Sequence, residues 1–567
     1  MIDDLKAHII SYYEKYKAPK VNCLSMRIKT SKNNKERVLK FLMVLKFCVP
    51  AVIFLLALRT VTNISFFIVA FLELLFSFIV VNLIAKRNTV VASIIAVFPL
   101  LIIGIQSAVL LFSGRYVNTL MLTNLSSISA LSGKALQYGG VVLCVVIILL
   151  LPVHHIDFRP FVKARFYIPI LAVLLIIDIG ICMIMNTYFS PTGSLASLVV
   201  DYNNMRKIDD IISDNANSDA YEEFYRTSVD DYINMPQDLN ENPDIVIIFM
   251  EGCSQNIIDD PRDIMPNIAE FQEQGLTFTN YYNHTAATYR GLIGQLYSAH
   301  QLHNSDTNQL ISVQEILGDY GYETEFINCE PENQEFSEYL NHMGFDDVSS
   351  PDTSDDLFVL DSEMYDSIYN SLSDAKESSK PRLIVAYTFG THCACDSMEE
   401  TFGDGDNRFL NRFYNTDYQF GAFFDRLEET GLDENTLIVL TTDHASVVDE
   451  DFINTFGDTY SRNHWFCDTI PLTFYYKGIT PETIDAEGRN SICFADTLLD
   501  YLDKSAPNFF LGESLFGAPN YDNLFVTTFC IPEDMEIYTT IDCEVVEATQ
   551  RNKRVFQERV TDYLSLV

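Results

Sequence analysis

The stretch NPDIVIIFMEG, Asn242 to Gly252, carries the pattern that decides the fold of this chain. A turn signal, Asn-Pro-Asp, is followed by an unbroken run of β-branched and apolar residues that ends at Glu251. Such a run is typical of a strand buried on both faces, as in a parallel sheet covered by helices. The stretch therefore predicts a central strand of an α/β domain.

Two similar runs follow along the chain, PRLIVAYTFGTH at 381–392 and NTLIVLTTDHAS at 435–446. Strands that alternate with helices favour a mostly parallel sheet. We therefore predict that residues 242–567 form one α/β domain around a central, mostly parallel sheet. The helical patterns that separate the three runs lie at 265–275, 312–321 and 411–431.

A different pattern occupies the chain before residue 190. Five apolar runs, each near the ~20 residues that a helix needs to cross a bilayer, predict a transmembrane domain of five helices over residues 41–189. Ionisable residues inside these runs, Lys46, Glu73 and Asp178, are interpreted as structural. The runs lie at 41–58, 64–85, 90–112, 139–153 and 167–185.

The basic residues predict the orientation of this domain. Ten Lys or Arg lie within residues 1–40, whereas the loops on the opposite side carry only Arg59, Arg115 and Lys134. Basic segments stay on the cytoplasmic side, so the N-terminus is predicted to be cytoplasmic. Five spans then place the α/β domain outside the plasma (inner) membrane, in the periplasm or the exterior. The polar residues 190–241 between the two parts predict a linker with amphipathic helices.

The charge of the chain is divided as unevenly as its hydrophobicity. The 567 residues carry a net charge of −39, and residues 1–189 hold 19 Lys+Arg but only 7 Asp+Glu. The remainder therefore holds 19 basic and 70 acidic residues, a net charge of −51. Such acidity excludes nucleic acid as a partner, because phosphate backbones are bound through clustered cations. Eight of the 12 cysteines, including Cys393 and Cys395, lie in this part, where an exported compartment would permit disulfides.

Polar side chains follow each of the three predicted strands. Glu251 follows the first, Thr391 and His392 follow the second, and Asp443 and His444 follow the third. Each alone is most often a solvated turn residue, but the carboxyl ends of parallel strands meet at one edge of a sheet, where ligand sites form. Carboxylates and an imidazole suit Mn²⁺, Mg²⁺ or Zn²⁺. Their joint position predicts a site for a divalent metal.

Two threonines, Thr285 and Thr288, lie in YYNHTAATYRGLIGQLYSAHQ at 281–301. A Thr at the start of a helix is most often an N-cap. An aliphatic hydroxyl becomes a useful nucleophile when a Lewis acid lowers its pKa, and a helix N-terminus adds N–H donors for a phosphate group. The residues alone leave open which of the two hydroxyls, if either, is a nucleophile.

Taken in order, these segments resemble a known family. IIFMEG, MPNIAEFQEQGLTFTNYYNHTAATYRGLIGQLYS, TFGTHCACD and TTDHAS are similar to the sulfatase/alkaline-phosphatase superfamily and above all to its membrane-anchored phosphotransferases. These are the lipoteichoic acid synthases, periplasmic-glucan phosphoglycerol transferases and lipid A phosphoethanolamine transferases. The resemblance implies a five-helix transmembrane bundle plus an extracellular, sulfatase-like α/β domain.

The resemblance also implies roles for single residues. Thr288 fits the family's nucleophile, since a small residue follows at the third position and an apolar helix after it; Thr285 remains the alternative. One divalent metal, Mn²⁺ before Mg²⁺ or Zn²⁺, would be held by Thr288 with the three strand-end ligands. Substrate phosphate would contact further basic side chains. The implied metal ligands are Glu251, Thr288, Asp443 and His444, and the implied substrate contacts are His392, His464 and Arg290.

The implied activity is the transfer of glycerol phosphate from phosphatidylglycerol to a cell-envelope glycan, glycolipid or polymer, through a phospho-threonine intermediate. Residues 321–348 are similar to phosphoglycerol transferases in particular. Neither threonine lies in the Cys-x-Pro/Ala-x-Arg setting of a sulfatase, which disfavours sulfate ester hydrolysis. Phosphoethanolamine transfer and a non-catalytic, glycan-binding membrane protein are the alternatives.

Overall fold

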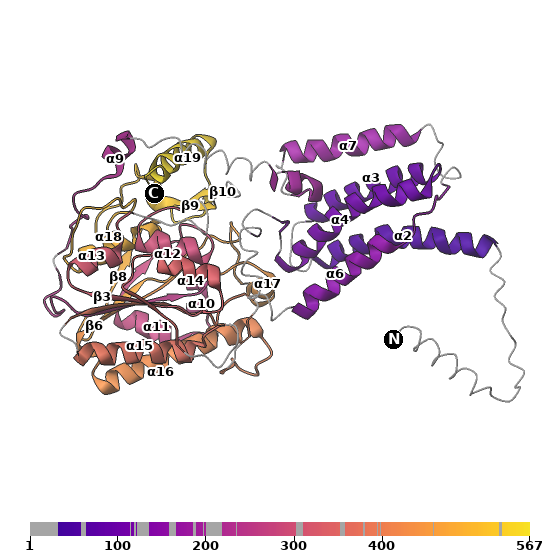
Figure 1. Cartoon of the computed structure of the whole chain (residues 1–567). Coiled ribbons are helices and arrows are strands. Elements are labelled where there is room, and N and C mark those ends of the chain that lie inside the picture. Colours follow the sequence, from indigo (N-terminus) through magenta and orange to yellow (C-terminus); the bar gives the residue numbers. More distant parts are fainter. Residues whose placement is uncertain are drawn as a thin grey trace, which may run out of the picture.

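A computed structural model shows the chain as a helical bundle beside an α/β domain (Figure 1). The predicted basic segment 1–40 lies mostly outside the described residues, as does the middle of the predicted linker. The structure describes residues 32–57, 64–113, 115–117, 121, 135–157, 166–184, 189–196, 198–199, 218–233, 235–301, 310–351, 358–377, 380–393, 395–396, 399–457, 459–531 and 536–566.

Three helices of the bundle are long and apolar enough to cross a membrane, namely α2 (Lys32–Ala57), α3 (Ser65–Ala85) and α4 (Thr89–Ser113). Two shorter apolar helices, α6 (Ala135–Leu150) and α7 (Tyr167–Ile184), pack against α4 and α3 respectively. The described residues therefore confirm an apolar helical part, and the count of five spans stays a prediction. The reason is length, because α6 has 16 residues and α7 has 18.

Two ionisable side chains of the bundle, Lys46 and Glu73, have hydrogen-bond partners there. The ammonium of Lys46 donates to the carbonyl oxygens of Leu149, at 2.9 Å, and Leu151, at 2.7 Å. These carbonyls end α6, where the unsatisfied acceptors of a helix favour a cation. Glu73 on α3 accepts a hydrogen bond of 2.5 Å from the hydroxyl of Ser190.

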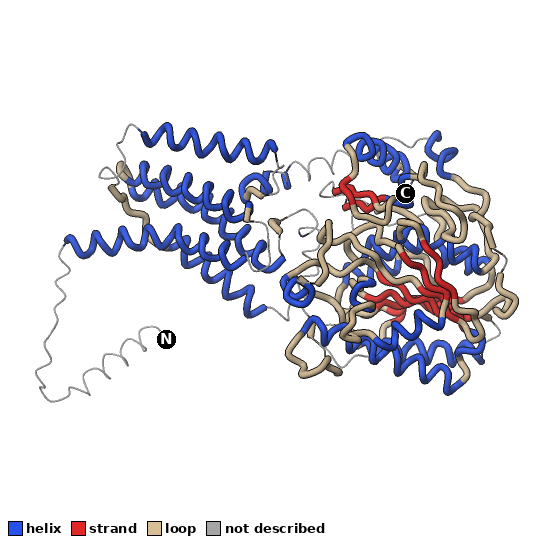
Figure 2. Tube along the Cα trace, turned by 180° about the vertical axis from the view of Figure 1, so that it is seen from behind, coloured by secondary structure: helices blue, strands red, loops and turns tan. Residues whose placement is uncertain are grey.

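The α/β domain is built on an eight-stranded sheet with the order β4-β3-β5-β1-β6-β7-β2-β8, seen in red between the helices in Figure 2. Strand β1 pairs in parallel with β5 and β6, and β3 pairs in parallel with β4 and β5; only the pairs that involve β7 and a neighbour are antiparallel. The predicted mostly parallel sheet is therefore confirmed. The strands are β1 (Asp244–Met250), β2 (Leu276–Thr279), β3 (Glu323–Ile327), β4 (Asp347–Ser349), β5 (Arg382–Tyr387), β6 (Thr436–Thr442), β7 (Thr473–Tyr475) and β8 (Glu482–Asp485).

Helices cover both faces of this sheet, with α15 and α16 on one face and α12 and α13 on the other (Figure 1). A second sheet of three strands, β9 (Thr528–Ile531), β10 (Glu536–Thr539) and β11 (Val546–Glu547), lies beside α19 (Figure 1). The helices are α9 (Ser218–Phe224), α10 (Gln255–Ile258), α11 (Pro266–Gln274), α12 (Thr288–Leu296), α13 (Val313–Asp319), α14 (Gln334–Asn341), α15 (Asp361–Glu377), α16 (Arg408–Thr430), α17 (Glu450–Phe456), α18 (Phe494–Tyr501) and α19 (Gln550–Leu564).

The register of the central strands positions the site. Phe249 of β1 pairs with Tyr387 of β5, and Met250 pairs with Thr442 of β6. The three predicted strands therefore end side by side, at the same edge of the sheet. The last six residues of β1 are fully buried, as expected for a run of apolar side chains that packs against helices on both faces.

Candidate metal centre

Three predicted ligands meet at the carboxyl edge of the sheet. Glu251 directly follows β1, and Asp443 and His444 directly follow β6. One ligand atom from each lies within 4.8 Å of the other two. The imidazole Nε2 of His444 is 3.5 Å from Glu251 Oε1 and 3.4 Å from Asp443 Oδ2. We call these three buried residues the metal cluster.

The hydrogen bonds around the cluster leave metal-binding atoms open. Asp443 Oδ1 accepts from the backbone N–H groups of Gly252, at 2.9 Å, and His444, at 2.7 Å, while Oδ2 is buried without a hydrogen-bond partner. His444 Nδ1 lies 2.9 Å from the carbonyl oxygen of Ala445. A carbonyl only accepts, so Nδ1 carries the proton and the lone pair of Nε2 faces the carboxylates. This donor set fits a divalent cation.

The electrostatics of the cluster point the same way. Burial raises the pKa of Glu251 well above its usual range, and the negative charge of Asp443 raises it further. Two carboxylates this close repel each other when both are ionised. A bound divalent cation would remove this cost and favour the ionised form of both groups.

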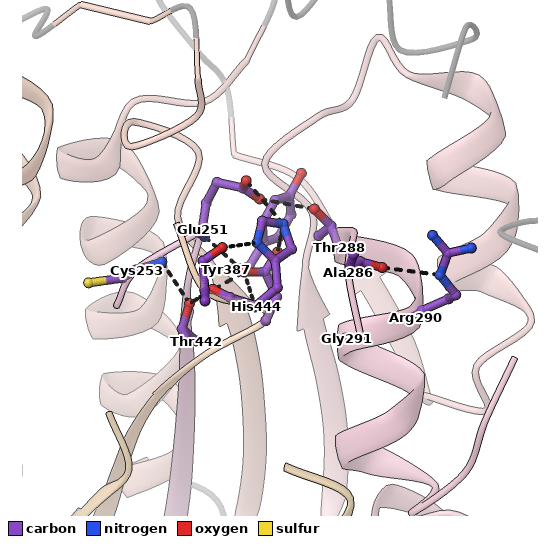
Figure 3. A network of polar contacts seen from close by, with 12 residues as sticks. Glu251, Cys253, Ala286, Thr288, Arg290, Gly291, Tyr387, Thr442 and His444 are labelled. Carbon is purple, nitrogen blue, oxygen red and sulfur yellow. Dashed lines mark hydrogen bonds and ion pairs between the residues drawn. The ribbon is translucent and has the colours of Figure 1, made fainter. Parts of the chain in front are cut away.

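Thr288 points toward the cluster. It is the first residue of α12, and its hydroxyl donates a hydrogen bond of 3.0 Å to Glu251 Oε2 (Figure 3). The residue before it, Ala287, occupies the N-cap position with φ of 73° and makes no capping bond through its side chain. A positive φ is uncommon for alanine and indicates local strain. The hydroxyl of Thr288 thus contacts a cluster carboxylate instead of capping the helix.

Thr285 points elsewhere. Its hydroxyl donates a hydrogen bond of 2.8 Å to the carbonyl oxygen of Cys530, and the residue is 1% exposed. Cys530 belongs to β9 of the small sheet. Thr285 therefore joins the loop before α12 to that sheet, and its hydroxyl proton is engaged in this hydrogen bond.

His392 lies near the cluster, beyond the end of β5. Its ring stacks on Phe389, with centroids 4.8 Å apart, and its Nδ1 is buried without a hydrogen-bond partner. Burial lowers the pKa of His392 to about 4, helped by the charge of Arg412. His392 is therefore neutral near pH 7 and offers an unused ring nitrogen. Its neighbour Thr391 donates to the carbonyl of Glu251.

The other two predicted substrate contacts are held away from the cluster. Figure 3 shows the guanidinium of Arg290 on the side of α12 turned away from Glu251 and His444, where its Nε donates to the carbonyl of Ala286 at 3.1 Å. His464 contacts Glu536, with His464 Nε2 at 2.7 Å from Glu536 Oε2. Neither side chain is brought to the metal cluster in this structure.

An acidic residue that the sequence analysis did not select, Glu330, lies in the same region. It follows β3 and accepts a hydrogen bond of 2.6 Å from the hydroxyl of Tyr387, at the end of the neighbouring β5. Burial raises the pKa of Glu330, and the charge of Asp443 contributes. The signal was present in the sequence, because Glu330 also follows a strand of the parallel sheet.

Helix α12 packs on the cluster through a glycine. A Cβ atom on Gly291 would lie 2.2 Å from the carbonyl oxygen of Asp443, far inside van der Waals contact. The backbone of α12 therefore touches the backbone that carries Asp443. This close approach fixes the distance between Thr288, one turn earlier in the helix, and the metal cluster.

Comparisons with known proteins concern mainly the α/β domain. Residues 243–504 match the family model described as Sulfatase. A search of curated proteins gave no match. Among solved structures, the chain is similar to a protein in the alkaline phosphatase superfamily from Vibrio parahaemolyticus, with 18% identity over 58% of this chain and 87% of that chain and a TM-score of 0.48.

The chain is also similar to the solved structures of a synthase and a transferase. The lipoteichoic acid synthase LtaP from Listeria monocytogenes is 13% identical over 58% of this chain and 94% of that chain, with a TM-score of 0.45. The integral membrane protein lipooligosaccharide phosphoethanolamine transferase A (EptA) from Neisseria meningitidis is 13% identical over 84% of this chain and 98% of that chain, with a TM-score of 0.47.

Proposed function

We propose that the chain, whose residues 243–504 match the Sulfatase family model, is a membrane-bound, metal-dependent phosphotransferase of the alkaline phosphatase/sulfatase superfamily with Thr288 as its nucleophile. One observation carries the proposal. The Thr288 hydroxyl lies 3.0 Å from a carboxylate oxygen of a buried Glu-Asp-His cluster in which Asp443 Oδ2 and His444 Nε2 are open to a cation.

In the first step, Thr288 Oγ1 attacks the phosphorus of a phosphodiester. Its hydroxyl proton is already directed at Glu251 Oε2, which is placed to accept it. The bond from phosphorus to the lipid oxygen breaks, and this oxygen leaves with a proton as the hydroxyl of diacylglycerol. The unused nitrogen of His392 is available to orient the phosphate, and the proton that the leaving oxygen gains comes from solvent, because a neutral imidazole is a poor acid. The product is a phosphodiester on Thr288.

In the second step, a hydroxyl of the acceptor attacks the same phosphorus, and its proton passes to the unused nitrogen of His392 and from there to solvent. The bond from phosphorus to Thr288 Oγ1 breaks, and the threonine oxygen regains a proton from Glu251. One phosphodiester is exchanged for another in each step, so the reaction requires neither an oxidant nor water. The uncapped N-terminus of α12 adds backbone N–H donors for the phosphoryl oxygens.

The metal cluster would hold the cation together with Thr288. When bound, a divalent ion supplies charge that lowers the pKa of the hydroxyl and stabilises the phosphoryl oxygens. Oxygen ligands with one imidazole suit Mn²⁺ best among the candidates, with Mg²⁺ and Zn²⁺ as alternatives.

The donor we propose is phosphatidylglycerol, and the acceptor is a cell-envelope glycan, glycolipid or polymer. The apolar helices hold the α/β domain at a bilayer, where a lipid donor is concentrated. The basic bias of residues 1–40 supports an α/β domain outside the plasma membrane, facing the outer leaflet. The similarity of residues 321–348 to phosphoglycerol transferases supports glycerol phosphate as the transferred group.

Phosphoethanolamine transfer is the second candidate, and Glu330 favours it. This carboxylate is close enough to the metal cluster for Asp443 to raise its pKa, and it retains some exposure to solvent. A carboxylate at this position suits an ammonium group better than a glycerol hydroxyl. Both headgroups therefore belong in the assay.

Replacing Thr288 by Ala tests the proposal. The full chain in Mn²⁺ is mixed with vesicles that contain fluorescent phosphatidylglycerol or phosphatidylethanolamine, and diacylglycerol release is measured. We expect Thr288→Ala to lose activity by a factor on the order of 10⁶. Thr285→Ala is the matched control and should keep most of its activity, because it loses one structural hydrogen bond worth about 1 kcal/mol.

Peptide mass mapping of the wild-type protein identifies the intermediate. A glycerophosphate or phosphoethanolamine adduct on the peptide that contains Thr288 is the expected result, and its mass names the donor. An adduct on Thr285, or full activity in Thr288→Ala, would assign the nucleophile elsewhere. No adduct and no lipid cleavage with either donor would favour the non-catalytic, glycan-binding alternative.

A further inference from the structure

Arg115 links the helical bundle to the α/β domain. It follows the end of α4, next to Tyr116, whose ring packs in the bundle against Phe54 and Phe66. Its guanidinium reaches Glu536 on β10, where one nitrogen pairs with Oε1 and the other lies 3.3 Å from Oε2. This bidentate ion pair joins residues that are 421 positions apart in the chain.

An aromatic ring completes the contact. The guanidinium carbon of Arg115 lies 4.2 Å from the ring centroid of Trp465, and the indole N–H of Trp465 donates to Glu536 Oε2 at 3.1 Å. Burial alone raises the pKa of Glu536, but the charge of Arg115 and the hydrogen bond from His464 outweigh it and lower the pKa to about 2. We call Arg115, His464, Trp465 and Glu536 the docking cluster.

His464 has no ring nitrogen left for a substrate. Its Nε2 donates to Glu536 Oε2 at 2.7 Å, and its Nδ1 accepts from the backbone N–H groups of Phe466 and Cys467, each at 3.1 Å. The side chain is 2% exposed. His464 therefore fixes the backbone of residues 464–467 to the carboxylate that Arg115 holds.

The same short segment contacts the metal cluster. The ring of Phe466 packs on the imidazole of His444, with centroids 4.8 Å apart. The carbonyl of Trp465 accepts a hydrogen bond of 3.0 Å from the N–H of Val448, in the loop that follows His444. Residues 464–467 thus pack against the imidazole of His444 and also hydrogen-bond to the loop that follows His444.

A second path leads from this segment to the nucleophile. The amide of Asn283 donates to the carbonyl of Phe466 and to the carbonyl of Thr285, both at 2.8 Å. Thr285 lies in the loop that enters α12 at Thr288. Ala286 and Ala287 of this loop also share an apolar cluster with Phe466. The segment held by the docking cluster therefore contacts both sides of the site.

We propose that Arg115 is a positioning residue, by which the helical bundle holds residues 464–467 and through them orients His444 and the entry to α12. The inference rests on the proposed metal site and extends it. Removal of the α/β domain from the bundle would release Glu536, which would loosen the support behind His444. The metal centre would then be fully formed only when the domain is docked on the membrane helices.

The surroundings of the pair make it stronger than a surface ion pair. The side chains of Arg115 and Glu536 are 9% and 19% exposed, whereas those of Arg426 and Asp366, a pair within the α/β domain, are 43% and 66% exposed. Arg426 also stacks on a ring, that of Tyr369, at 3.4 Å. Both pairs therefore combine an arginine, a carboxylate and an aromatic ring, but only the first is shielded from water and salt.

Mn²⁺ binding to the full chain in detergent tests the proposal. Arg115→Met should weaken Mn²⁺ binding and lower kcat by about 3- to 10-fold each, with Arg115→Lys between this variant and the wild type, because coupling through one packed layer is moderate. Arg426→Met is the matched control and should leave both values unchanged. Glu536→Gln should reproduce the effect of Arg115→Met.

The double variant separates positioning from a general loss of stability. If Arg115 acts through Glu536, Arg115→Met combined with Glu536→Gln should be no worse than either single change. Wild-type Mn²⁺ affinity in Arg115→Met, or additive losses in the double variant, would overturn the inference alone. A wild-type chain that bound no Mn²⁺ would refute the proposed metal site and with it this inference.

Discussion

Two buried histidines of the α/β domain, His444 and His464, differ in how their ring nitrogens are used. His444 donates from Nδ1 to a backbone carbonyl and presents an open Nε2 to two carboxylates. His464 has the opposite arrangement, because its Nδ1 accepts from two backbone N–H groups and its Nε2 donates to Glu536. Both rings are almost completely shielded from solvent.

The contacts of the ring nitrogens indicate which of the two histidines can bind a metal. A buried polar atom without a hydrogen-bond partner is costly, so the unpartnered Asp443 Oδ2 beside His444 Nε2 indicates a site that suits a cation. A buried histidine whose two ring nitrogens both form hydrogen bonds within the protein, as in His464, connects segments of the structure. Residue type and burial are the same in both places, and only the contacts of the ring nitrogens separate the proposed metal ligand, His444, from the proposed support, His464.

The largest change is expected when Asp443, a proposed metal ligand beside His444, is replaced. In Asp443→Asn, the side-chain oxygen can still accept from Gly252 and His444, but the charge at Oδ2 is lost. We expect Mn²⁺ affinity to fall by at least about 100-fold, because the loss of a ligand should cost more than the loss of a residue that only orients one. Transfer activity should be abolished. Isothermal titration with Mn²⁺ measures the change.

Asp449→Asn is the control for this substitution, since Asp449 caps α17 in the same loop and asparagine caps equally well. Its Mn²⁺ affinity should equal that of the wild type. Equal metal binding by Asp443→Asn and the wild type would remove the distinction between the two histidines.

A smaller effect is expected from Gly291→Ala, which pushes α12 away from Asp443. The new Cβ would lie 2.2 Å from the carbonyl oxygen of Asp443, so the helix must shift. We expect a loss of about 1–3 kcal/mol in the free energy of unfolding, as for overpacked sites. Activity should fall more than Mn²⁺ affinity, because Thr288 moves with the helix while the cluster stays.

Gly318→Ala on α13 is the matched change, since a Cβ there meets nothing within 4 Å. This variant should be as stable as the wild type or more stable, by up to about 1 kcal/mol. Thermal unfolding and headgroup release compare the two. Similar behaviour of both variants would contradict the close packing of α12 on Asp443.

A smaller effect is expected for the charge of Glu536, whose contribution to stability decreases in acid. The pKa of Glu536 is lowered from 4.5 to about 2 in the folded chain, so the stability that its charge contributes is complete above pH 4.5. This contribution is lost as the pH falls from 4.5 toward 2. The Tm of Glu536→Gln should therefore lie below that of the wild type at pH 6, and the gap should narrow by pH 3. A gap independent of pH would show that the Glu536 charge does not hold the docking cluster.

Much of the α/β domain could be predicted from local patterns. The runs around 245–250, 383–387 and 437–442 are apolar on both faces, and such runs form interior strands of a parallel sheet. Because parallel strands end at one edge, the position of Glu251, Asp443 and His444 at that edge followed as well. The number of spans did not follow, since apolar composition does not fix where a helix begins and ends.

The roles of the threonines and of His464 depended on distant contacts. Thr285 and Thr288 are three residues apart, yet one hydroxyl faces β9 and the other faces Glu251. The strained backbone at Ala287 separates these directions, and no sequence pattern predicts a positive φ for alanine. The family resemblance implied a substrate contact for His464, and no local pattern indicated its contact with Glu536, which lies 72 residues away in the chain.

Local patterns in the sequence were enough to predict which residue types could bind a metal and at which edge of the sheet they would lie, because burial patterns and strand direction are local properties. The atoms that remain open depend on tertiary contacts. Hydrogen bonds between residues far apart in the chain satisfy His464 and Thr285, whereas Asp443 Oδ2 has no hydrogen-bond partner and His444 Nε2 faces the two carboxylates of the metal cluster. The pairing of Arg115 with Glu536 depends on tertiary contacts in the same way, since it joins residues 421 positions apart in the chain.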